Sequence, residues 1–369
     1  MTILIFLIIL GILVFVHELG HFLTAKKAGV AVEEFGFGYP PRALKLGKKW
    51  NTLFSLNWIP FGGFVKIVGE NYEETPARGE VSAGKNFTQV SKKWQAGILV
   101  AGITFNILFA WFLFSLGFLI GVPTPAENDF GATVTDPQLT VVELVSDYPA
   151  QKAGLKTGDK ILSISDGGKT LQTLNPENIS DFVNQSSGQI DIQVDRGSKI
   201  LDFKITPETD KILNSSGQAR KIVGISMDMV GILKLPLHKA IYEGGITTAK
   251  LSYLTVQGIV DLIKSAVIGK ANISEVTGPV GIVGLVGDAS RLGFSYLLTF
   301  TALISINLAI VNLIPFPALD GGRVIFVAIE GITKRKINPK IAGTLNNVGF
   351  ALLILLMLFV TYRDILKLF

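Results

Sequence analysis

Four apolar segments limit what this chain can fold into, because each is close to the 20 or so residues needed to cross a bilayer core. They cover residues 3–25, 96–122, 294–314 and 345–362. Apolar residues make up 49% of the 369 residues and charged residues only 17%, which is unusual for a soluble protein of this size. The sequence therefore predicts a polytopic α-helical membrane protein with four transmembrane helices, a membrane-associated β-hairpin loop and an inserted α+β domain.

The predicted segments follow one another in a definite order. They are a transmembrane helix at 1–25, a cytoplasmic or membrane re-entrant β-loop at 26–95, a second transmembrane helix at 96–122, an extracytoplasmic domain at 127–208, a linker with an amphipathic helix at 209–290, a third transmembrane helix ending in LDGG at 291–322, a cytoplasmic loop at 323–344, and a fourth transmembrane helix with the C-terminus at 345–369.

The distribution of lysine and arginine sets the expected topology. These residues are concentrated between the first and second apolar segments and between the third and fourth. The positive-inside rule places both loops in the cytoplasm, so that the termini and the central domain lie outside. Because the basic residues flank apolar segments, the net charge of +5 indicates contact with the lipid bilayer and no nucleic-acid partner. The first segment is too long for a cleavable signal peptide and lacks a basic leader.

Three further stretches carry their own patterns. Residues 32–68 alternate aromatic and apolar residues with glycine and proline, which predicts short strands in a hairpin. Its apolarity favours a hairpin that dips into the membrane, and an ordinary cytoplasmic hairpin is the alternative. Strand-like runs at 139–145, 160–165, 190–194 and 201–206 predict the α+β domain. Residues 236–269 predict an amphipathic helix at the membrane surface, with His238 as an interfacial residue.

The first apolar segment contains the sequence HELGH. Its two histidines, His17 and His21, lie one helical turn apart on the same face, where they can share a metal ion, and Glu18 can act as a general base. Packing or hydrogen-bonded histidines are the alternative. Ionisable groups inside a membrane are costly and usually mark a function, so we favour the metal site.

A catalytic zinc ion usually has three protein ligands and one open position. The chain has no cysteine and therefore no disulfide, and it offers no other suitable histidine, so an acidic residue is needed. Asp320 in NLIPFPALDGGRV is the candidate. Pro315 and Pro317 stop the preceding helix, so we expect an extended approach, and the glycines after Asp320 allow close backbone packing. A simple cytoplasmic Asp-Gly-Gly turn is the alternative.

Taken together, these motifs resemble the site-2 protease family (M50), specifically its bacterial RseP/RasP-type intramembrane zinc metalloproteases with one PDZ domain. The resemblance rests on HELGH, FGFG, GGFVKIVGE, TGPVGI and N-x-x-P-x-P-x-L-D-G-G, and it covers almost the whole chain. It implies that His17, His21 and Asp320 bind Zn2+ and that Glu18 is the catalytic base. The segment 154–164 resembles a PDZ core.

The resemblance also implies a set of substrate-positioning residues, which are Asn312, Pro315, Asn106, Gly62 and Gly63. One departure concerns the second apolar segment, where relatives often carry G-P-x-x-N. Here Ile103 follows Gly102, although Asn106 is kept, so the local bend of that helix is open. A second departure is the single PDZ-like module, since many relatives from Gram-negative bacteria carry two in tandem.

We therefore expect a zinc metalloendopeptidase in the inner or plasma membrane of a bacterium. It would cleave the transmembrane helices of single-span proteins, such as an anti-sigma factor or signal-peptide remnants, in regulated intramembrane proteolysis. With His17 about 20 Å along its helix, the active site would lie near the cytoplasmic side. The alternatives are an ion- or proton-coupled transporter, in which the same side chains relay protons, and an inactive PDZ membrane scaffold.

Overall fold

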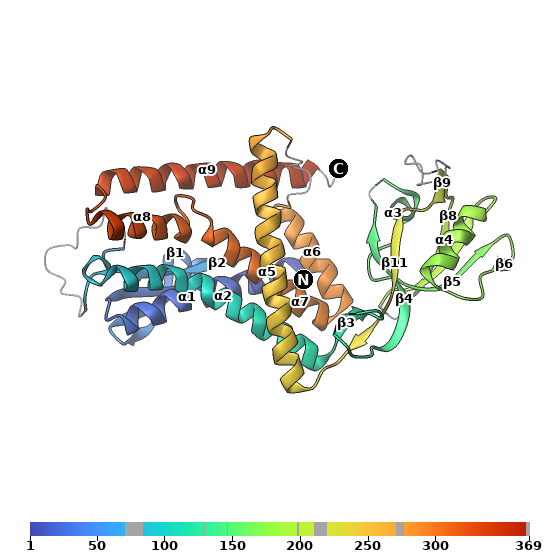
Figure 1. Ribbon diagram of the computed structural model, residues 1–369, viewed down its shortest axis with the longest axis horizontal. Coiled ribbons are helices and arrows are strands. Elements are labelled where there is room, and N and C mark those ends of the chain that lie inside the picture. Colours follow the sequence, from blue (N-terminus) through green and yellow to red (C-terminus); the bar gives the residue numbers. More distant parts are fainter. Residues whose placement is uncertain are drawn as a thin grey trace. The chain divides into compact units, whose positions relative to one another are not determined.

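The computed structural model describes residues 1–70, 84–128, 130–145, 147–197, 199–209, 220–270 and 277–366, without the side chains of residues 60 and 61. Parts of the predicted 26–95 loop, the 209–290 linker and the C-terminus lie outside these residues. The chain forms two compact units (Figure 1). The helical unit contains residues 1–116, 241–290 and 297–369, and the sheet unit contains 117–240 and 291–296.

Within the described residues, four helices are long and apolar enough to cross a membrane, as the sequence predicts. They are α1 (Thr2–Lys27), α2 (Lys92–Ile120), α7 (Phe294–Leu313) and α9 (Pro339–Leu366). Helix α9 begins at Pro339, before the predicted apolar segment at 345–362, because capping residues and not hydropathy set the end of a helix. The side chain of Asn338 accepts a hydrogen bond from the backbone N–H of Lys340 at 3.0 Å, and Pro339 occupies the first turn.

Three other helices lie wholly or largely in the helical unit. The predicted amphipathic helix is present as α5 (Leu237–Val267), which runs across the direction of α9 (Figure 1). The sequence does not predict α6 (Pro279–Leu292), nor α8 (Asp320–Thr333), which occupies much of the predicted 323–344 loop. Both are only 14 residues long, and neither contains an apolar run of membrane-spanning length.

The predicted hairpin consists of β1 (Val32–Lys49) and β2 (Thr52–Ile67), which pair antiparallel. Residues 34–37 lie between residues 53–56 on one side and 63–66 on the other, because β2 doubles back along β1. Phe22 of α1 is buried with Phe35 and Ile67 of the hairpin and with Ile98 of α2. This shared core fixes the hairpin against the helix that carries HELGH.

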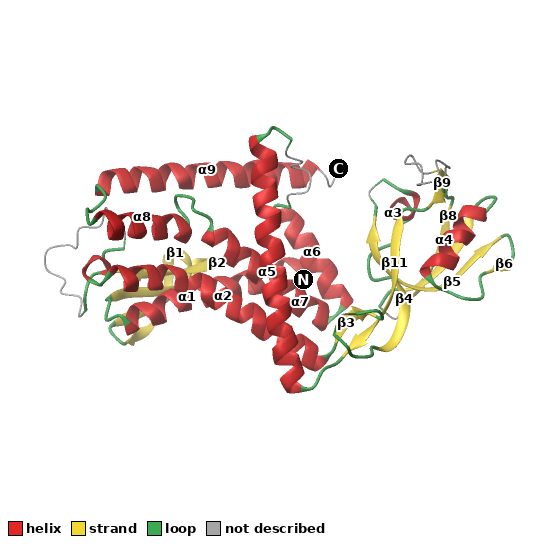
Figure 2. Cartoon of the chain, viewed as in Figure 1, coloured by secondary structure: helices red, strands yellow, loops and turns green. Residues whose placement is uncertain are grey.

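The sheet unit is built on one antiparallel sheet in the order β3-β11-β4-β5-β7-β8, with β6 paired to β5 (Figure 2). Its strands are β3 (Val122–Pro125), β4 (Thr135–Leu144), β5 (Lys160–Asp166), β6 (Lys169–Thr170), β7 (Ile190–Asp195), β8 (Ile200–Ile205) and β11 (Ile225–Leu233). A separate pair is formed by β9 (Glu208–Thr209) and β10 (Lys221–Ile222). The remaining helices are the single 3-10 turn η1 (Phe87–Gln89) in the helical unit, and α3 (Pro149–Lys152) and α4 (Pro176–Gln185) in the sheet unit.

The sheet extends past the predicted domain at 127–208, since β3 and β11 are hydrogen-bonded into it from either side of that range. Apolar side chains from the strands and α4 form its core, including Ile164, Ile179 and Ile192. Asp159 is fully buried and accepts two hydrogen bonds of 2.6 Å from Arg196, an arrangement that raises the pKa of the guanidinium. This pair fixes the turn before β5 to the end of β7.

Candidate metal centre

The two motif histidines lie on the buried face of α1, as their spacing predicts. His17 and His21 retain only 7% and 6% of their exposure, and their ring centroids are 4.7 Å apart. The two Nε2 atoms approach to 3.1 Å. Two imidazoles whose Nε2 atoms meet at one point inside a bundle can form part of a metal site.

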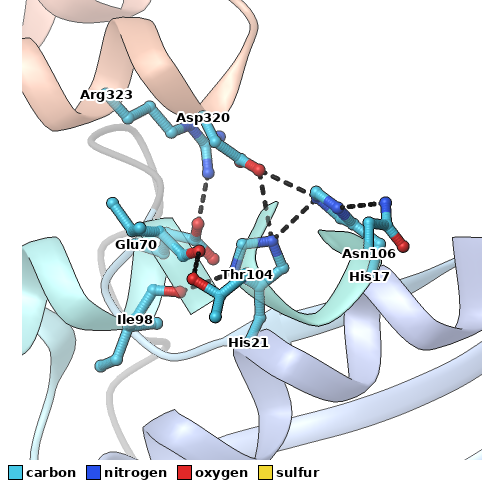
Figure 3. Close-up of polar contacts among 9 residues, drawn as sticks. His17, His21, Glu70, Ile98, Thr104, Asn106, Asp320 and Arg323 are labelled. Atoms are coloured by element: carbon cyan, nitrogen blue, oxygen red, sulfur yellow. Dashed lines mark hydrogen bonds and ion pairs between the residues drawn. The ribbon is translucent and has the colours of Figure 1, made fainter. Parts of the chain in front are cut away.

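The carboxylate of Asp320 completes this group from a helix more than 300 residues further along the chain. Its Oδ2 lies 2.9 Å from His17 Nε2 and 3.3 Å from His21 Nε2 (Figure 3). The three ligand atoms therefore form a triangle with edges of 2.9, 3.1 and 3.3 Å. A tetrahedral zinc ion with bonds of 2.0–2.1 Å requires edges of about 3.3 Å, so the three side chains fit zinc with one position left open.

The outer nitrogens of both imidazoles have partners on α2. The Nδ1 of His21 lies 2.8 Å from the carbonyl oxygen of Ile98, which only a protonated Nδ1 can satisfy. In the neutral imidazole this leaves Nε2 with a lone pair for a metal ion. The Nδ1 of His17 lies 3.2 Å from the amide Nδ2 of Asn106, whose buried Oδ1 is left without a partner. Turning the amide by 180° lets Oδ1 accept from a protonated Nδ1, as a metal-bound His17 requires.

Two glycines allow the helices to approach closely enough for these contacts. A Cβ on Gly20 of α1 would lie 2.5 Å from the carbonyl oxygen of Ala101. A Cβ on Gly102 of α2 would lie 2.4 Å from His21 Nε2 and 2.7 Å from His17 Nε2. The imidazole edges thus rest directly on the backbone of α2, which explains why glycine is needed at this position.

Glu18 points toward the hairpin. The backbone N–H of Val65 in β2 donates a hydrogen bond to its carboxylate, and a Cβ on Gly63 would lie 4.0 Å from its Cγ. Gly62 has a positive φ of 76° and packs beside Val14 of α1. The structure thus brings Gly62 and Gly63 to the same side of α1 as Glu18.

Three of the predicted substrate-positioning residues have different surroundings. Asn312 is half-buried in the last turn of α7, and Pro315 is exposed in the connection to α8. Asn106 is fully buried and contacts the imidazole of His17. It therefore lies behind His17 and contacts that ring on the side away from the candidate metal position. The residues singled out by the resemblance therefore fall into one group beside Glu18, one beside His17 and one near the turn before Asp320.

The predicted extended approach to Asp320 is wrong. The chain between α7 and α8 forms turns, in which Phe316 N–H donates to Ile314 and Leu319 N–H donates to Phe316. Ala318 adopts a left-handed φ of 75°, and its N–H donates to Asn346 of α9 at 3.1 Å. The prolines end α7, as predicted. Two closely spaced prolines are compatible with turns as well as with an extended chain, and the contact of Ala318 with α9 favours the turns.

Sequence reasoning missed an ion pair beside the metal ligands. Arg323 of α8 contacts Glu70, which follows β2 (Figure 3). Glu70 is the last residue of the GGFVKIVGE motif, and Arg323 directly follows LDGG. Their spacing in sequence gave no signal of the contact, because 253 residues separate them.

A candidate metal-binding triad enclosed by helices that can cross a membrane fits a membrane metallopeptidase. Comparison with known families agrees with this class. The family model for peptidase family M50 matches residues 5–356, and the chain belongs to this family. It is accordingly a zinc-dependent metalloprotease of the site-2 type and a bacterial membrane protein, and the transporter and scaffold alternatives are not favoured.

Relatives match over nearly their whole length. A protein of Clostridium perfringens, whose name marks it as a provisional zinc metalloprotease, is 36% identical over 361 residues, which is 96% of this chain and 95% of that protein. The zinc metalloprotease RasP of Oceanobacillus iheyensis is 29% identical, and the match covers 100% of this chain and 99% of that protein. The zinc metalloprotease RasP of Geobacillus kaustophilus is 30% identical, and the match covers 99% of this chain and 97% of that protein.

Proposed function

We propose that this protein cleaves transmembrane helices of single-span membrane proteins, with His17, His21 and Asp320 as its zinc ligands and Glu18 as its general base. The observation that carries the proposal is the triangle of ligand atoms, with edges of 2.9 to 3.3 Å, formed on a membrane-spanning helix. A peptide bond that reaches this point must belong to a segment inside or at the edge of the bilayer.

The roles of the chain's own groups follow from their positions. Zinc, when bound, supplies Lewis acidity toward water and the scissile carbonyl. Glu18 takes a proton from the attacking water and later gives it to the leaving amine. The hydrogen bond from Val65 N–H orients the Glu18 carboxylate for this transfer. Ile98 and Asn106 hold the imidazole rings in the orientation that presents Nε2.

The substrate helix unwinds before cleavage, because a helix hides its peptide bonds. Residues 63–66 of β2 pair with β1 along one edge, and no strand within the described residues pairs with the other. Such an edge, next to Glu18, holds an extended peptide by main-chain hydrogen bonds. In this role Gly62 and Gly63 let the substrate backbone approach, while Asn312 and Pro315 contact it from the end of α7.

The remaining parts of the proposal concern topology and regulation. The sheet unit, with its helix α3 followed by the turn into β5, is a PDZ-like domain on the extracytoplasmic side that screens substrates. The hairpin enters the membrane, and the active site lies near the cytoplasmic side, as the basic loops favour. Anti-sigma factors and signal-peptide remnants are the substrate classes that the family resemblance suggests, within regulated intramembrane proteolysis.

The experiment that tests the chemistry uses Glu18→Gln in the purified full-length protein with a transmembrane reporter substrate. We expect cleavage to fall by about 10²- to 10⁴-fold, because the base is lost while the ligands stay. Zinc content, measured by elemental analysis, should remain at the wild-type level in Glu18→Gln and be lost in Asp320→Ala. Normal cleavage by Glu18→Gln, or full zinc content in Asp320→Ala, contradicts the proposal.

A further inference from the structure

The ion pair between Glu70 and Arg323 joins two elements that meet at the metal centre. Arg323 lies three residues after Asp320, on the same side of the first turn of α8. Glu70 lies three residues after the end of β2, the strand whose Val65 contacts Glu18. The two side chains are largely enclosed, with 15% exposure for Glu70 and 29% for Arg323. Figure 3 shows the pair beside Asp320 and His21.

Arg323 lies near the amino end of α8, a position that is unfavourable for a cation unless negative charge is close by, and Asp320 and Glu70 both place a carboxylate on its side of the helix. The first turn of a helix carries the positive end of the helix dipole, which disfavours a cation there. The carboxylate of Glu70 supplies the negative charge, and a partly buried ion pair of this kind depends strongly on the presence of both members. The amino end of α8, and with it Asp320, is therefore held toward Glu70.

Glu70 is itself fixed in place by the backbone around it. Val68 N–H donates to the carbonyl of Ala31 at 3.0 Å, and Val68 accepts from Phe87 N–H at 2.8 Å. Gly69 turns the chain with a φ of 75°, and Glu70 N–H closes the turn onto Ile67 at 3.3 Å. The carboxylate thus projects from a rigid point and can act as an anchor for another element.

We propose that Glu70 and Arg323 are a positioning pair, which holds the carboxylate of Asp320 over the two histidines and ties the metal site to β2. The inference rests on the proposed role of Asp320 as a ligand. Without the pair, α8 keeps another ion pair, since Lys92 of α2 contacts Glu330 near the far end of the helix. Asp320 lies ten residues from that contact, so small rotations of α8 displace its carboxylate.

The pair also has an electrostatic consequence. Glu70 is close enough to act electrostatically on both Glu18 and His21. Removal of Arg323 alone leaves this carboxylate uncompensated beside the site, whereas removal of both charges does not. A double-mutant cycle can therefore separate loss of the ion pair from gain of an uncompensated charge. It consists of Arg323→Gln, Glu70→Gln and the variant that carries both changes.

The test compares Arg323→Gln, Glu70→Gln, the double variant and Arg323→Lys in full-length protein in lipid nanodiscs. We measure zinc retained against a chelator, kcat and KM for the transmembrane reporter, and thermal unfolding of the zinc-free protein. We expect zinc affinity and kcat to fall by about 10- to 100-fold in Arg323→Gln, as is usual for groups that orient metal ligands, with little change in KM. The double variant should be less impaired than Arg323→Gln, and Arg323→Lys should recover most of the loss.

Lys92→Gln is the matched control, because it breaks a second partly buried ion pair of α8, the one with Glu330. We expect it to lower thermal stability while zinc affinity and kcat stay near wild type. Equal losses of zinc in Lys92→Gln and Arg323→Gln, or wild-type zinc affinity in Arg323→Gln, overturn the inference. Asp320→Ala distinguishes the two proposals, because if it retains zinc the ligand assignment itself fails, whatever the pair does.

Discussion

At the scale of single residues, the metal centre depends on the absence of a side chain. The imidazole edges of His17 and His21 rest on Gly102, and Gly20 allows α1 to meet α2 at the same level. Neither glycine has a positive φ, so both are required by space and not by backbone conformation. The HELGH sequence thus provides two of the proposed ligands and also, through Gly20, the close helix contact that encloses them.

Gly102→Ala should abolish the site while leaving the fold largely intact. The added Cβ would lie 2.4 Å from His21 Nε2, a distance that forces the rings to move. We expect loss of bound zinc and at least about a 100-fold fall in cleavage, since a displacement near 1 Å has effects of that size. Gly97→Ala on the same helix is the control, because nothing lies within 4 Å of its Cβ. Zinc binding by Gly102→Ala at the wild-type level would contradict this account of the packing.

At the scale of elements, the TGPVGI motif forms the start of α6, where it meets α9. The buried carboxylate of Asp364 accepts hydrogen bonds from Gly278 N–H at 3.2 Å and Gly281 N–H at 2.8 Å. A Cβ on Gly278 would lie 2.7 Å from Val360 and 2.8 Å from Asp364. The first turn of α6 is therefore capped by a side chain from another helix, and the motif glycines make room for it.

Asp364→Ala should destabilise the helical unit, because one buried and one half-buried N–H group lose their acceptor. The expected cost is about 1–3 kcal/mol, as for other unsatisfied buried groups. Asp364→Asn keeps one acceptor oxygen and should lose less. Thermal unfolding of the purified protein measures both, with Thr361→Ala on the same helix as the control. A melting temperature for Asp364→Ala equal to that of the control would show that the cap contributes little.

At the scale of the whole molecule, the proposed metal ligands join α1, the first helix, to α8, a late one. Zinc should therefore stabilise the fold as well as supply the chemistry. Removal of zinc by a chelator is expected to lower the unfolding free energy by about 2.7 kcal/mol when free zinc is 100 times its dissociation constant. The melting temperature with and without chelator measures this, and the His17→Ala variant should show no such shift. A chelator effect of equal size in His17→Ala would mean that zinc acts at another place.

The sequence predicts the membrane-spanning helices because a bilayer demands long apolar runs, and hydropathy reads these directly. It also predicts the geometry of His17 and His21, since one helix carries both. It does not predict α6 and α8, which are short and lie outside those runs. Contacts such as Glu70 with Arg323 or Asp364 with Gly281 depend on which elements meet in three dimensions, and no spacing within one element encodes them.

The long sequence separation of the ligands has a consequence for biosynthesis. The contact between His17 and Asp320 joins residues 303 positions apart. A ribosome that has released only the first helices into the membrane has produced two histidines and no third ligand. With Asp320 as the proposed third ligand, the nascent chain cannot hydrolyse a peptide bond until translation has passed α8. An unfinished protease would therefore not cleave its neighbours at the site of insertion.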